Sequence, residues 1–329
     1  MKIFVCEFVT GGGLYREPLP SSLAQEGALM LNAVMSGLSR LPDIEIVTTH
    51  DARLAASHAR ASVKIMPEQD VWAIWEQCMR EADAVWPIAP ESDGVLLRLC
   101  ELAMRHGKLL LASHPDAIRV AASKIATCKH LVDAGIPVVT TCTRFNLELL
   151  GNGACVVKPD DGTSGEGSRV FENKQALSDW LSKQQHADTL VIQSLEAGIP
   201  ASISMLCMNG EAWLLSCNRQ RVECVDESFC YRGSVLNDLQ SCWSQFDMLA
   251  KQVARALPGL AGYIGIDVII GENTVRVLEI NPRLTTSYAG LEQAIGRNPA
   301  ELILNMFYNG GFSSPPLIER NIVEVRLNE

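Results

Sequence analysis

The chain has 329 residues, a formal net charge of −10 at neutral pH, and 47% hydrophobic residues. This length exceeds what one compact core usually holds, so we expect a folded protein with two or three lobes. The acidic balance argues against nucleic acid or an anionic membrane as the main partner. No apolar run approaches the roughly 18 residues that span a membrane. The first residues resemble a signal peptide, but Glu7 interrupts their apolar run, and we interpret them as a first strand.

The eleven cysteines are scattered and form no C-x-x-C pair. This pattern predicts reduced, mostly buried thiols in a cytoplasmic protein rather than a disulfide framework. Cys217, Cys224 and Cys230 form the closest group, but their spacing is atypical of zinc sites, and we favour packing for them. The six histidines show no H-x-x-x-H pattern, so nothing supports a zinc protease.

The first part of the chain, up to about residue 115, alternates strand-like and helix-like segments, as parallel α/β layers do. Asp116 and Gly135 are suitable caps for the last of the helices. We expect strands at 2–9, 44–49, 83–89 and 108–113 and helices at 22–41, 71–82, 94–107 and 116–135.

The pattern changes after residue 136. The segment 153–171 is strand, glycine-rich loop, strand, which predicts a β-hairpin rather than a βαβ unit. A helix at 174–185 and a strand at 189–195 follow. The rest is rich in strands, and we expect them at 201–208, 211–223, 262–270 and 274–282, with helices at 244–256 and 298–308.

Three consecutive glycines at 11–13 follow the first predicted strand. A dinucleotide fingerprint opens a helix directly, whereas two prolines follow here and we expect no helix to begin. A flexible loop and a substrate loop both stay open, because ligands of open α/β sheets bind beyond the carboxyl ends of strands. Glu7, Thr10 and Glu91 lie near such ends, where a carboxylate could bind a substrate ammonium group or simply be solvated.

The segment VVKPDDGTSGEGSRV places a lysine at the end of an apolar strand, before a loop rich in glycines and hydroxyl groups. Glycines let successive backbone N–H groups converge on phosphate oxygens, and hydroxyl groups add donors. It is not a Walker A loop, because the lysine precedes the glycines. An ordinary hairpin turn needs fewer such residues, so we expect phosphate binding. The residues concerned are Lys158, Gly162, Thr163, Ser164, Gly165, Gly167 and Ser168.

Acidic side chains stand near the end of two apolar strands. Glu279 and Asn281 are two positions apart, so their side chains point to the same face. The turn GENT predicts a hairpin that brings Asp267 to that face. Two carboxylates and an amide suit Mg²⁺, which prefers oxygen ligands. A buried ion pair with Arg276 or Arg283 is the structural alternative, and the glycine-rich loop favours the metal.

The ordered set of motifs resembles the ATP-grasp enzymes over essentially the whole chain. The set comprises a helical lysine (Lys124), Lys158 before the glycine-rich flap, a hinge strand at 193–195, Asp267, and E-x-N-P-R at 279–283. No single member is specific, but the order is.

The resemblance implies a mixed α/β ATP-grasp fold with α+β lobes. Residues 1–118 would form a Rossmann-like pre-ATP-grasp domain, 119–192 a central lid that carries the flap, and 193–329 the C-terminal ATP-grasp lobe. ATP would lie between the last two parts.

The same resemblance implies how the nucleotide is held. Lys124 and Lys158 would contact the α- and β-phosphates, and the flap would cover them. Gln193 and the backbone of Ser194 and Leu195 would meet adenine.

The resemblance also implies that Asp267, Glu279 and Asn281 bind two Mg²⁺ ions, which Mn²⁺ could replace. Many relatives have an acidic residue about seven positions after the hinge begins, where it binds ribose. This chain reads AGIPAS there, so the ribose contact stays open, with Glu196 as one candidate.

The resemblance would also give Arg283 and Arg219 a role in catalysis. A substrate carboxylate would attack the γ-phosphate to form an acyl phosphate, and an amine would then displace phosphate. Arg283 would stabilise the negative charge that develops. Arg219 and Lys158 are the other catalytic candidates, although an exposed strand arginine such as Arg219 needs no functional explanation.

Several phrases resemble the tyramine–glutamate ligase family of methanofuran biosynthesis: EFVTGGG, EGALM, APESDG, NRQ and EINPRLTTSY, the last of which contains Thr285 as a weak substrate candidate. The resemblance implies amide formation between the γ-carboxyl group of glutamate and tyramine, tyrosine or another amine. A different ligase pair, a small-molecule kinase and a nucleotide-binding regulator remain alternatives, although the chain has few clustered basic residues for a kinase. The expected partners are small molecules, with no nucleic acid or membrane, and a homodimer is left open.

Overall fold

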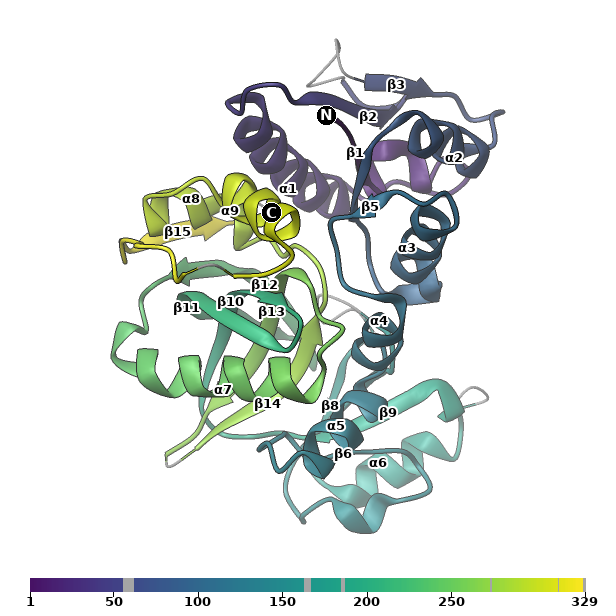
Figure 1. Ribbon diagram of the computed structural model, residues 1–329. Coiled ribbons are helices and arrows are strands. Elements are labelled where there is room, and N and C mark those ends of the chain that lie inside the picture. The colour runs from purple at the N-terminus through teal and green to yellow at the C-terminus, as the bar shows by residue number, and fades with distance from the viewer. Residues whose placement is uncertain (56–61, 163–166, 185–186, 273, 313, 328–329) are drawn as a thin grey trace.

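The computed structural model describes residues 1–329 except 56–61, 163–166, 185–186, 273, 313 and 328–329. Three β-sheets organise this part of the chain (Figure 1). The N-terminal sheet, the antiparallel lid sheet and the large C-terminal sheet follow one another along the sequence and surround the cleft described below.

The N-terminal sheet is parallel and has the strand order β3-β2-β1-β4-β5. The predicted alternation of strands and helices is confirmed here, and the structure adds the short strand β3. The central strands β1 and β4 are continuous apolar runs, and their successive side chains bury against helices on opposite faces of the sheet. The elements are β1 (Lys2–Glu7), α1 (Ser21–Ser39), β2 (Glu45–Asp51), β3 (Ser62–Ile65), α2 (Val71–Glu81), β4 (Ala84–Ile88), η3 (Ser92–Gly94), α3 (Val95–Arg105) and β5 (Leu109–Leu110).

The triple glycine ends a short helical turn, η1 (Val9–Gly13), which begins before the glycines, and the next helix starts only at Ser21, so no helix opens from the glycines, as expected. A Cβ on Gly11 would lie 2.9 Å from Thr49 Oγ1, and one on Gly12 would lie 2.9 Å from Ile65. Gly12 also has φ = 99°, which side chains disfavour. Close packing against β2 and β3 therefore explains these glycines, and the segment is buried rather than a free loop.

The helix predicted over 116–135 is two helices, α4 (Pro115–Ala121) and α5 (Lys124–Asp133). Ser123 separates them, and its hydroxyl oxygen accepts a hydrogen bond from Ala126 N at 3.1 Å. This N-cap starts a new helix. Lys124 is thus the first residue of α5, which holds it at the helix end.

The lid sheet has the strand order β6-β9-β7-β8 and its own apolar core. The predicted hairpin across the glycine-rich segment is confirmed, because β7 and β8 pair antiparallel. Strand β9 crosses the predicted boundary at residue 192 and belongs to the lid sheet. The elements are β6 (Thr141–Cys142), η4 (Leu147–Leu149), β7 (Cys155–Pro159), β8 (Arg169–Phe171), α6 (Lys174–Leu181), η5 (Ala187–Thr189) and β9 (Leu190–Ser194).

The C-terminal sheet has the strand order β14-β13-β10-β11-β12-β15, and α7 covers one face while α8 and α9 cover the other (Figure 1). Its elements are β10 (Ile199–Met208), β11 (Glu211–Val225), β12 (Ser228–Leu236), η6 (Gln240–Cys242), α7 (Trp243–Ala256), β13 (Gly262–Ile270), β14 (Val275–Asn281), α8 (Tyr288–Ile295), α9 (Pro299–Asn309) and β15 (Val323–Arg326).

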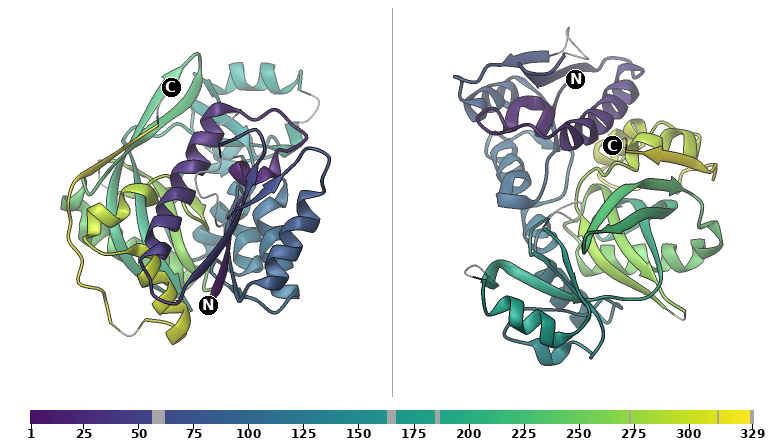
Figure 2. Two further views of the ribbon diagram at one scale, coloured as in Figure 1. Left: turned by 90° about the horizontal axis from the view of Figure 1, so that it is seen from above. Right: turned by 180° about the vertical axis from the view of Figure 1, so that it is seen from behind.

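The N-terminal and C-terminal parts share one hydrophobic core. Helix α1 packs on α8 and α9, and Asn298 Nδ2 donates to Gly37 O at 2.9 Å (Figure 2). The lid joins the C-terminal sheet through hydrogen bonds between Val139 N and Val277 O and between Val277 N and Pro137 O, each 2.9 Å. Among the described helices, none is both long and apolar enough to span a bilayer.

Candidate active site

A cleft of about 260 Å³ lies between the lid sheet and the C-terminal sheet. Strands β7 and β9 line it from the lid side, and β11, β13 and β14 line it from the other side. Helix α5 contributes Lys124 to the lining, and helix α1 contributes Glu26 and Met30. Most of the residues that the sequence singled out meet in this cleft.

The predicted carboxylate hairpin is confirmed. Strands β13 and β14 pair antiparallel, with Asp267 opposite Glu279 and Gly265 opposite Asn281. A bulge follows Asp267 and shifts the register. Asn281 Nδ2 donates to Asp267 Oδ2 at 3.3 Å, so the three predicted metal-binding side chains lie together.

The electrostatic environment of the two carboxylates differs. Burial and the neighbouring Glu279 raise the pKa of Asp267 to about 8. Burial also opposes the ionisation of Glu279, but the charges of Lys158 and Lys124 outweigh it and lower the pKa of this carboxyl. The two lysines thus stabilise the charge of Glu279 more than that of Asp267.

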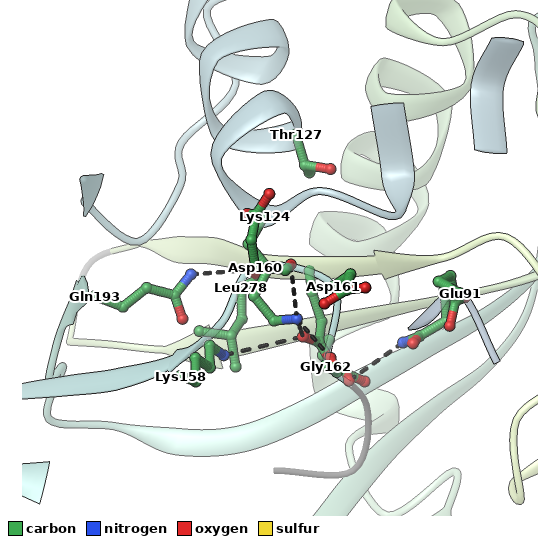
Figure 3. A network of polar contacts seen from close by, with 12 residues as sticks. Glu91, Lys124, Thr127, Lys158, Asp160, Asp161, Gly162, Gln193 and Leu278 are labelled. Carbon is green, nitrogen blue, oxygen red and sulfur yellow. Dashed lines mark hydrogen bonds and ion pairs between the residues drawn. The ribbon is translucent and has the colours of Figure 1, made fainter. Parts of the chain in front are cut away.

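Two lysines converge on Glu279 from different elements (Figure 3). Lys124 Nζ lies 3.5 Å and Lys158 Nζ lies 3.9 Å from Glu279 Oε2. Lys124 also donates to Gly162 O at 2.6 Å, which ties α5 to the start of the flap. Burial lowers the pKa of Lys158, partly against the attraction of Glu279. The two ammonium groups are desolvated donors, suited to bind phosphate oxygens.

The flap approaches the C-terminal sheet through its second half. Gly162 and Ser168 line the cleft, and Gly167 has φ = 67°, the left-handed conformation that favours glycine. The hydroxyl oxygen of buried Ser168 accepts from Phe229 N at 3.1 Å. The predicted phosphate-binding residues Thr163, Ser164 and Gly165 lie outside the described residues.

The base of the flap is fixed from the other side. Asp160 Oδ1 accepts from Ile125 N at 2.9 Å, and Asp161 Oδ2 accepts from Asp93 N at 3.1 Å. Ser92 Oγ donates to Asp161 O at 3.0 Å. These bonds connect the flap to α5 and to η3 of the N-terminal part.

The hinge residues lie at the far end of the cleft. Gln193 is buried, and its Nε2 donates to Thr141 Oγ1 at 2.9 Å and to Leu278 O at 3.4 Å (Figure 3). Ser194, Leu195 and Glu196 also line the cleft. Glu196 Oε2 lies 3.5 Å from Arg276 Nη1, so Arg276 pairs with this residue rather than with the hairpin carboxylates.

Arg283 lies at the junction between the cleft and the N-terminal sheet. Its Nε donates to Glu91 Oε2 at 2.9 Å, and both side chains are largely buried, at 12% and 5% exposure. Nη1 donates to Leu284 O at 3.0 Å. Glu91, predicted as a substrate residue, therefore positions Arg283 beside the cleft.

The structure does not bring Arg219 to the cleft. Its side chain pairs with Asp238 at 2.5 Å, whereas the next residue, Gln220, points the opposite way and donates to Asp267 Oδ1 at 2.8 Å. Alternation along β11 places neighbours on opposite faces. Sequence analysis missed Gln220, because the motif NRQR does not indicate which of its side chains face the cleft.

Of the other predicted substrate residues, Thr285 lines the cleft and Thr10 does not. Thr285 Oγ1 lies 2.9 Å from the hydroxyl group of Tyr263, in a polar network beneath the site. Buried Glu7 accepts from Val9 N at 3.2 Å, from Thr10 N at 2.6 Å and from Thr10 Oγ1 at 2.5 Å. Burial raises the pKa of Glu7 against these bonds, and the carboxyl group caps η1.

The donor set of the hairpin fits Mg²⁺. Asp267, Glu279 and Asn281 offer two carboxylates and an amide oxygen, the ligand types that Mg²⁺ prefers, and they face one another in the cleft. Elsewhere in the described part of the chain, no three His, Cys, Asp or Glu side chains are placed to share a metal. Of the three cysteines grouped in the sequence, Cys217 is buried, Cys230 is half-buried and Cys224 is exposed, so the expected packing holds fully only for Cys217.

Comparisons with known proteins agree with this geometry. Residues 121–287 match the ATP-grasp domain, and residues 44–118 match a pre-ATP-grasp domain. A tyramine–L-glutamate ligase of Methanocaldococcus fervens is 24% identical over 82% of this chain and 84% of its own length. The Methanocaldococcus jannaschii enzyme of the same name is 26% identical over 74% of this chain and 69% of its own.

Solved structures share the fold at low sequence identity. An ATP-grasp superfamily protein from Archaeoglobus fulgidus has a TM-score of 0.69 and 21% identity, over 99% of both chains. The biotin carboxylase domain of Hydrogenobacter thermophilus 2-oxoglutarate carboxylase, solved with MgADP, has a TM-score of 0.72, with 97% of this chain and 72% of that chain covered. An L-amino acid ligase from Bacillus licheniformis has a TM-score of 0.62, with 92% of this chain and 72% of that chain covered. The chain belongs to the ATP-grasp family.

Proposed function

We propose that this protein is an ADP-forming, ATP-dependent ligase that joins a carboxylate to an amine. The observation that carries the proposal is the meeting, in one cleft, of two lysines, two carboxylates and an amide, with the Arg283 guanidinium at its edge. Phosphoryl transfer depends mostly on positioning and charge neutralisation, and these groups supply both.

The cleft residues divide the work of holding ATP. Lys124 and Lys158 bind the α- and β-phosphates, and the flap covers the nucleotide with its backbone N–H groups. Gln193 and the hinge backbone at 194–195 contact adenine. Asp267, Glu279 and Asn281 hold two Mg²⁺ ions. Bound Mg²⁺ supplies charge neutralisation at the phosphate oxygens.

The substrate carboxylate is oriented beside Arg283 and attacks the γ-phosphorus of ATP. An acyl phosphate forms, ADP leaves, and the amine then attacks the acyl carbon and displaces phosphate. Arg283 stabilises the oxyanion of that second step, because its guanidinium is held by Glu91 before the charge develops. Gln220 and Thr285 complete the wall around the donor site.

The donor is glutamate, reacting through its γ-carboxyl group, and the acceptor is an aromatic amine such as tyramine, in a methanofuran-type biosynthesis. The support is similarity to two tyramine–L-glutamate ligases over most of their length and of this chain. A direct assay of the substrates tests this assignment.

The assay combines ATP, Mg²⁺ and glutamate with and without an amine, and measures both ADP and the mass of the product. The proposal predicts ADP release that depends on the amine and a product mass equal to glutamate plus amine minus water. A phosphorylated alcohol would instead identify a kinase. Tight ATP binding without any ADP release, for every acid and amine tried, would leave a nucleotide-binding regulator.

A further inference from the structure

A second cavity, of about 420 Å³, opens at the carboxyl ends of β1 and β4. These strands are neighbours in the sheet, but the chain runs from β1 to β2 on one side and reaches β4 on the other. Ligands of open α/β sheets bind at such a reversal of strand order. We call this space the N-terminal cavity.

The N-terminal cavity adjoins the nucleotide cleft. Glu26, Met30 and Arg283 line both spaces. A molecule in the N-terminal cavity can therefore present a group to the carboxyl carbon activated beside Arg283. This position suits the second substrate of a two-substrate reaction.

Apolar and charged side chains both line the N-terminal cavity. Phe8, Trp72, Ile88 and Val95 line it together with Met30. The guanidinium carbon of Arg98 lies 3.7 Å from the centroid of the Trp72 ring, so this cation already has a partner. A ligand with an aromatic or apolar body would bury that body here.

The charged groups that line the N-terminal cavity differ in whether they have a hydrogen-bond or ion-pair partner. Glu7 accepts three hydrogen bonds from η1, and Arg283 is paired with Glu91. Glu26, on α1, is half-buried and makes no hydrogen bond or ion pair with a described residue. Burial raises its pKa, while Arg283 lowers it. This carboxylate is desolvated and lacks a donor.

Glu91 lies next to the N-terminal cavity but is not one of its lining residues. It lies between the cavity residues Pro90 and Ser92, is 5% exposed, and binds Arg283 through Oε2. Its Oε1 is buried without a hydrogen-bond partner in the described structure. Buried carboxylate oxygens normally have a donor.

We propose that the N-terminal cavity binds the acceptor amine, with Glu26 as the partner of its ammonium group and the apolar side chains around its body. This inference rests on the proposed ligase function and names the substrate class for one of its sites. Glu26 lies where the two cavities meet, so the nitrogen is held toward Arg283 while the body extends toward Trp72.

The same charges favour an amine that lacks a carboxyl group. Four carboxylates line the N-terminal cavity, namely those of Glu7, Glu17, Glu26 and Asp93. Only two guanidinium groups line it, those of Arg98 and Arg283. Both guanidinium groups already have partners. The α-carboxylate of an amino acid would meet repulsion there, so tyramine is accepted and tyrosine is not.

The test compares wild type, Glu26→Gln and the control Glu68→Gln, an exposed carboxylate of the same domain. Steady-state assays give KM for tyramine, tyrosine and ATP. Replacing tyramine with hydroxylamine traps the acyl phosphate without using the cavity. Titration calorimetry of tyramine with the ADP–Mg²⁺ complex measures binding without turnover.

The proposal predicts that Glu26→Gln raises KM for tyramine about tenfold or more, the usual effect of losing a charged partner. KM for ATP and the hydroxylamine rate stay within twofold of wild type, Glu68→Gln behaves as wild type, and tyrosine is used far less well than tyramine. An unchanged tyramine KM in Glu26→Gln would overturn the cavity assignment while the ligase function stands. If wild type forms no amide, the function fails, and calorimetry alone decides the cavity: tyramine binding that Glu26→Gln abolishes supports it, and the absence of binding overturns it.

Discussion

Arg283 and Arg219 illustrate how much a single side chain depends on its partner. Sequence analysis predicts both arginines as catalytic candidates. Arg283 is held by Glu91 at the junction of two cavities, whereas Arg219 pairs with Asp238 on the opposite face of β11 from Gln220. Only the first can act on a group in the cleft.

We therefore expect Arg283→Lys to lower kcat by about 10²–10³, the usual effect of losing one preorganised donor to a developing oxyanion. Lysine keeps the charge but loses the planar fork that Glu91 holds. Arg219→Lys is the matched control and should change kcat by less than about threefold. Steady-state kinetics of both variants test this, and equal losses would refute the separation of their roles.

The carboxylate hairpin makes the stability of the protein depend on pH when Mg²⁺ is absent. With a folded pKa of about 8, Asp267 binds a proton in the folded state that the unfolded chain releases near pH 4. The contribution of this group is complete below pH 4 and is lost as pH rises toward 8.

Asp267→Asn removes this titration, so the variant should gain stability relative to wild type as pH rises from 5 to 9. Thermal unfolding of both proteins without Mg²⁺ measures the difference. Mg²⁺ together with ADP should restore wild type at pH 8. If the difference in stability between wild type and Asp267→Asn does not change with pH, Asp267 is ionised in the folded protein over the whole range from pH 5 to 9.

At the scale of elements, the lid is attached to the C-terminal sheet by the start of β8. Ser168 accepts from Phe229 N, and Val170 N donates to Glu227 O at 2.8 Å. These bonds join the flap to the β11–β12 hairpin. They hold Ser168, at the described end of the flap, against the cleft that it lines.

Ser168→Ala leaves Phe229 N without its acceptor, which costs about 1 kcal/mol, or roughly a fivefold weaker closed state. We expect KM for ATP to rise by about that factor. Ser182→Ala, at the exposed end of α6 in the same lid, is the control and should leave KM unchanged. Equal ATP KM values in all three proteins would mean that lid attachment does not contribute to ATP binding.

Local patterns predicted most elements, and the exceptions have physical causes. The β13–β14 hairpin followed from alternation and a turn, both local signals. The break at Ser123 was missed because the apolar pattern continues across it, while its hydroxyl group caps a new helix. Strands β3, β12 and β15 and helix α8 depend on tertiary pairing and gave weak local signals.

The site was predictable where residue types are unusual for their position. Lys124, Lys158, Asp267 and Glu279 are charged groups at the ends of apolar elements, and the structure brings them together. Gln220 and Glu26 could not be found, because a polar residue on an amphipathic element is normally solvated. Which face it occupies depends on packing between segments far apart in the sequence.

At the scale of the whole molecule, three sheets bring together groups that no one part could assemble. The lid and the C-terminal sheet enclose the nucleotide cleft, and the N-terminal sheet adds the cavity beside Arg283. The shared core between α1, α8 and α9 fixes the N-terminal and C-terminal parts relative to each other. In the proposed reaction, donor activation and amine binding would meet beside Arg283, which lines both spaces.

The central claim is that a carboxylate attacks the γ-phosphorus of ATP in this cleft. The most direct measurement uses glutamate labelled with ¹⁸O in its γ-carboxyl group, together with ATP, Mg²⁺ and tyramine, followed by mass analysis of the released phosphate. The account predicts one ¹⁸O atom in each phosphate formed, with amide and ADP in equal amounts. Unlabelled phosphate, or label that appears in AMP, would contradict it.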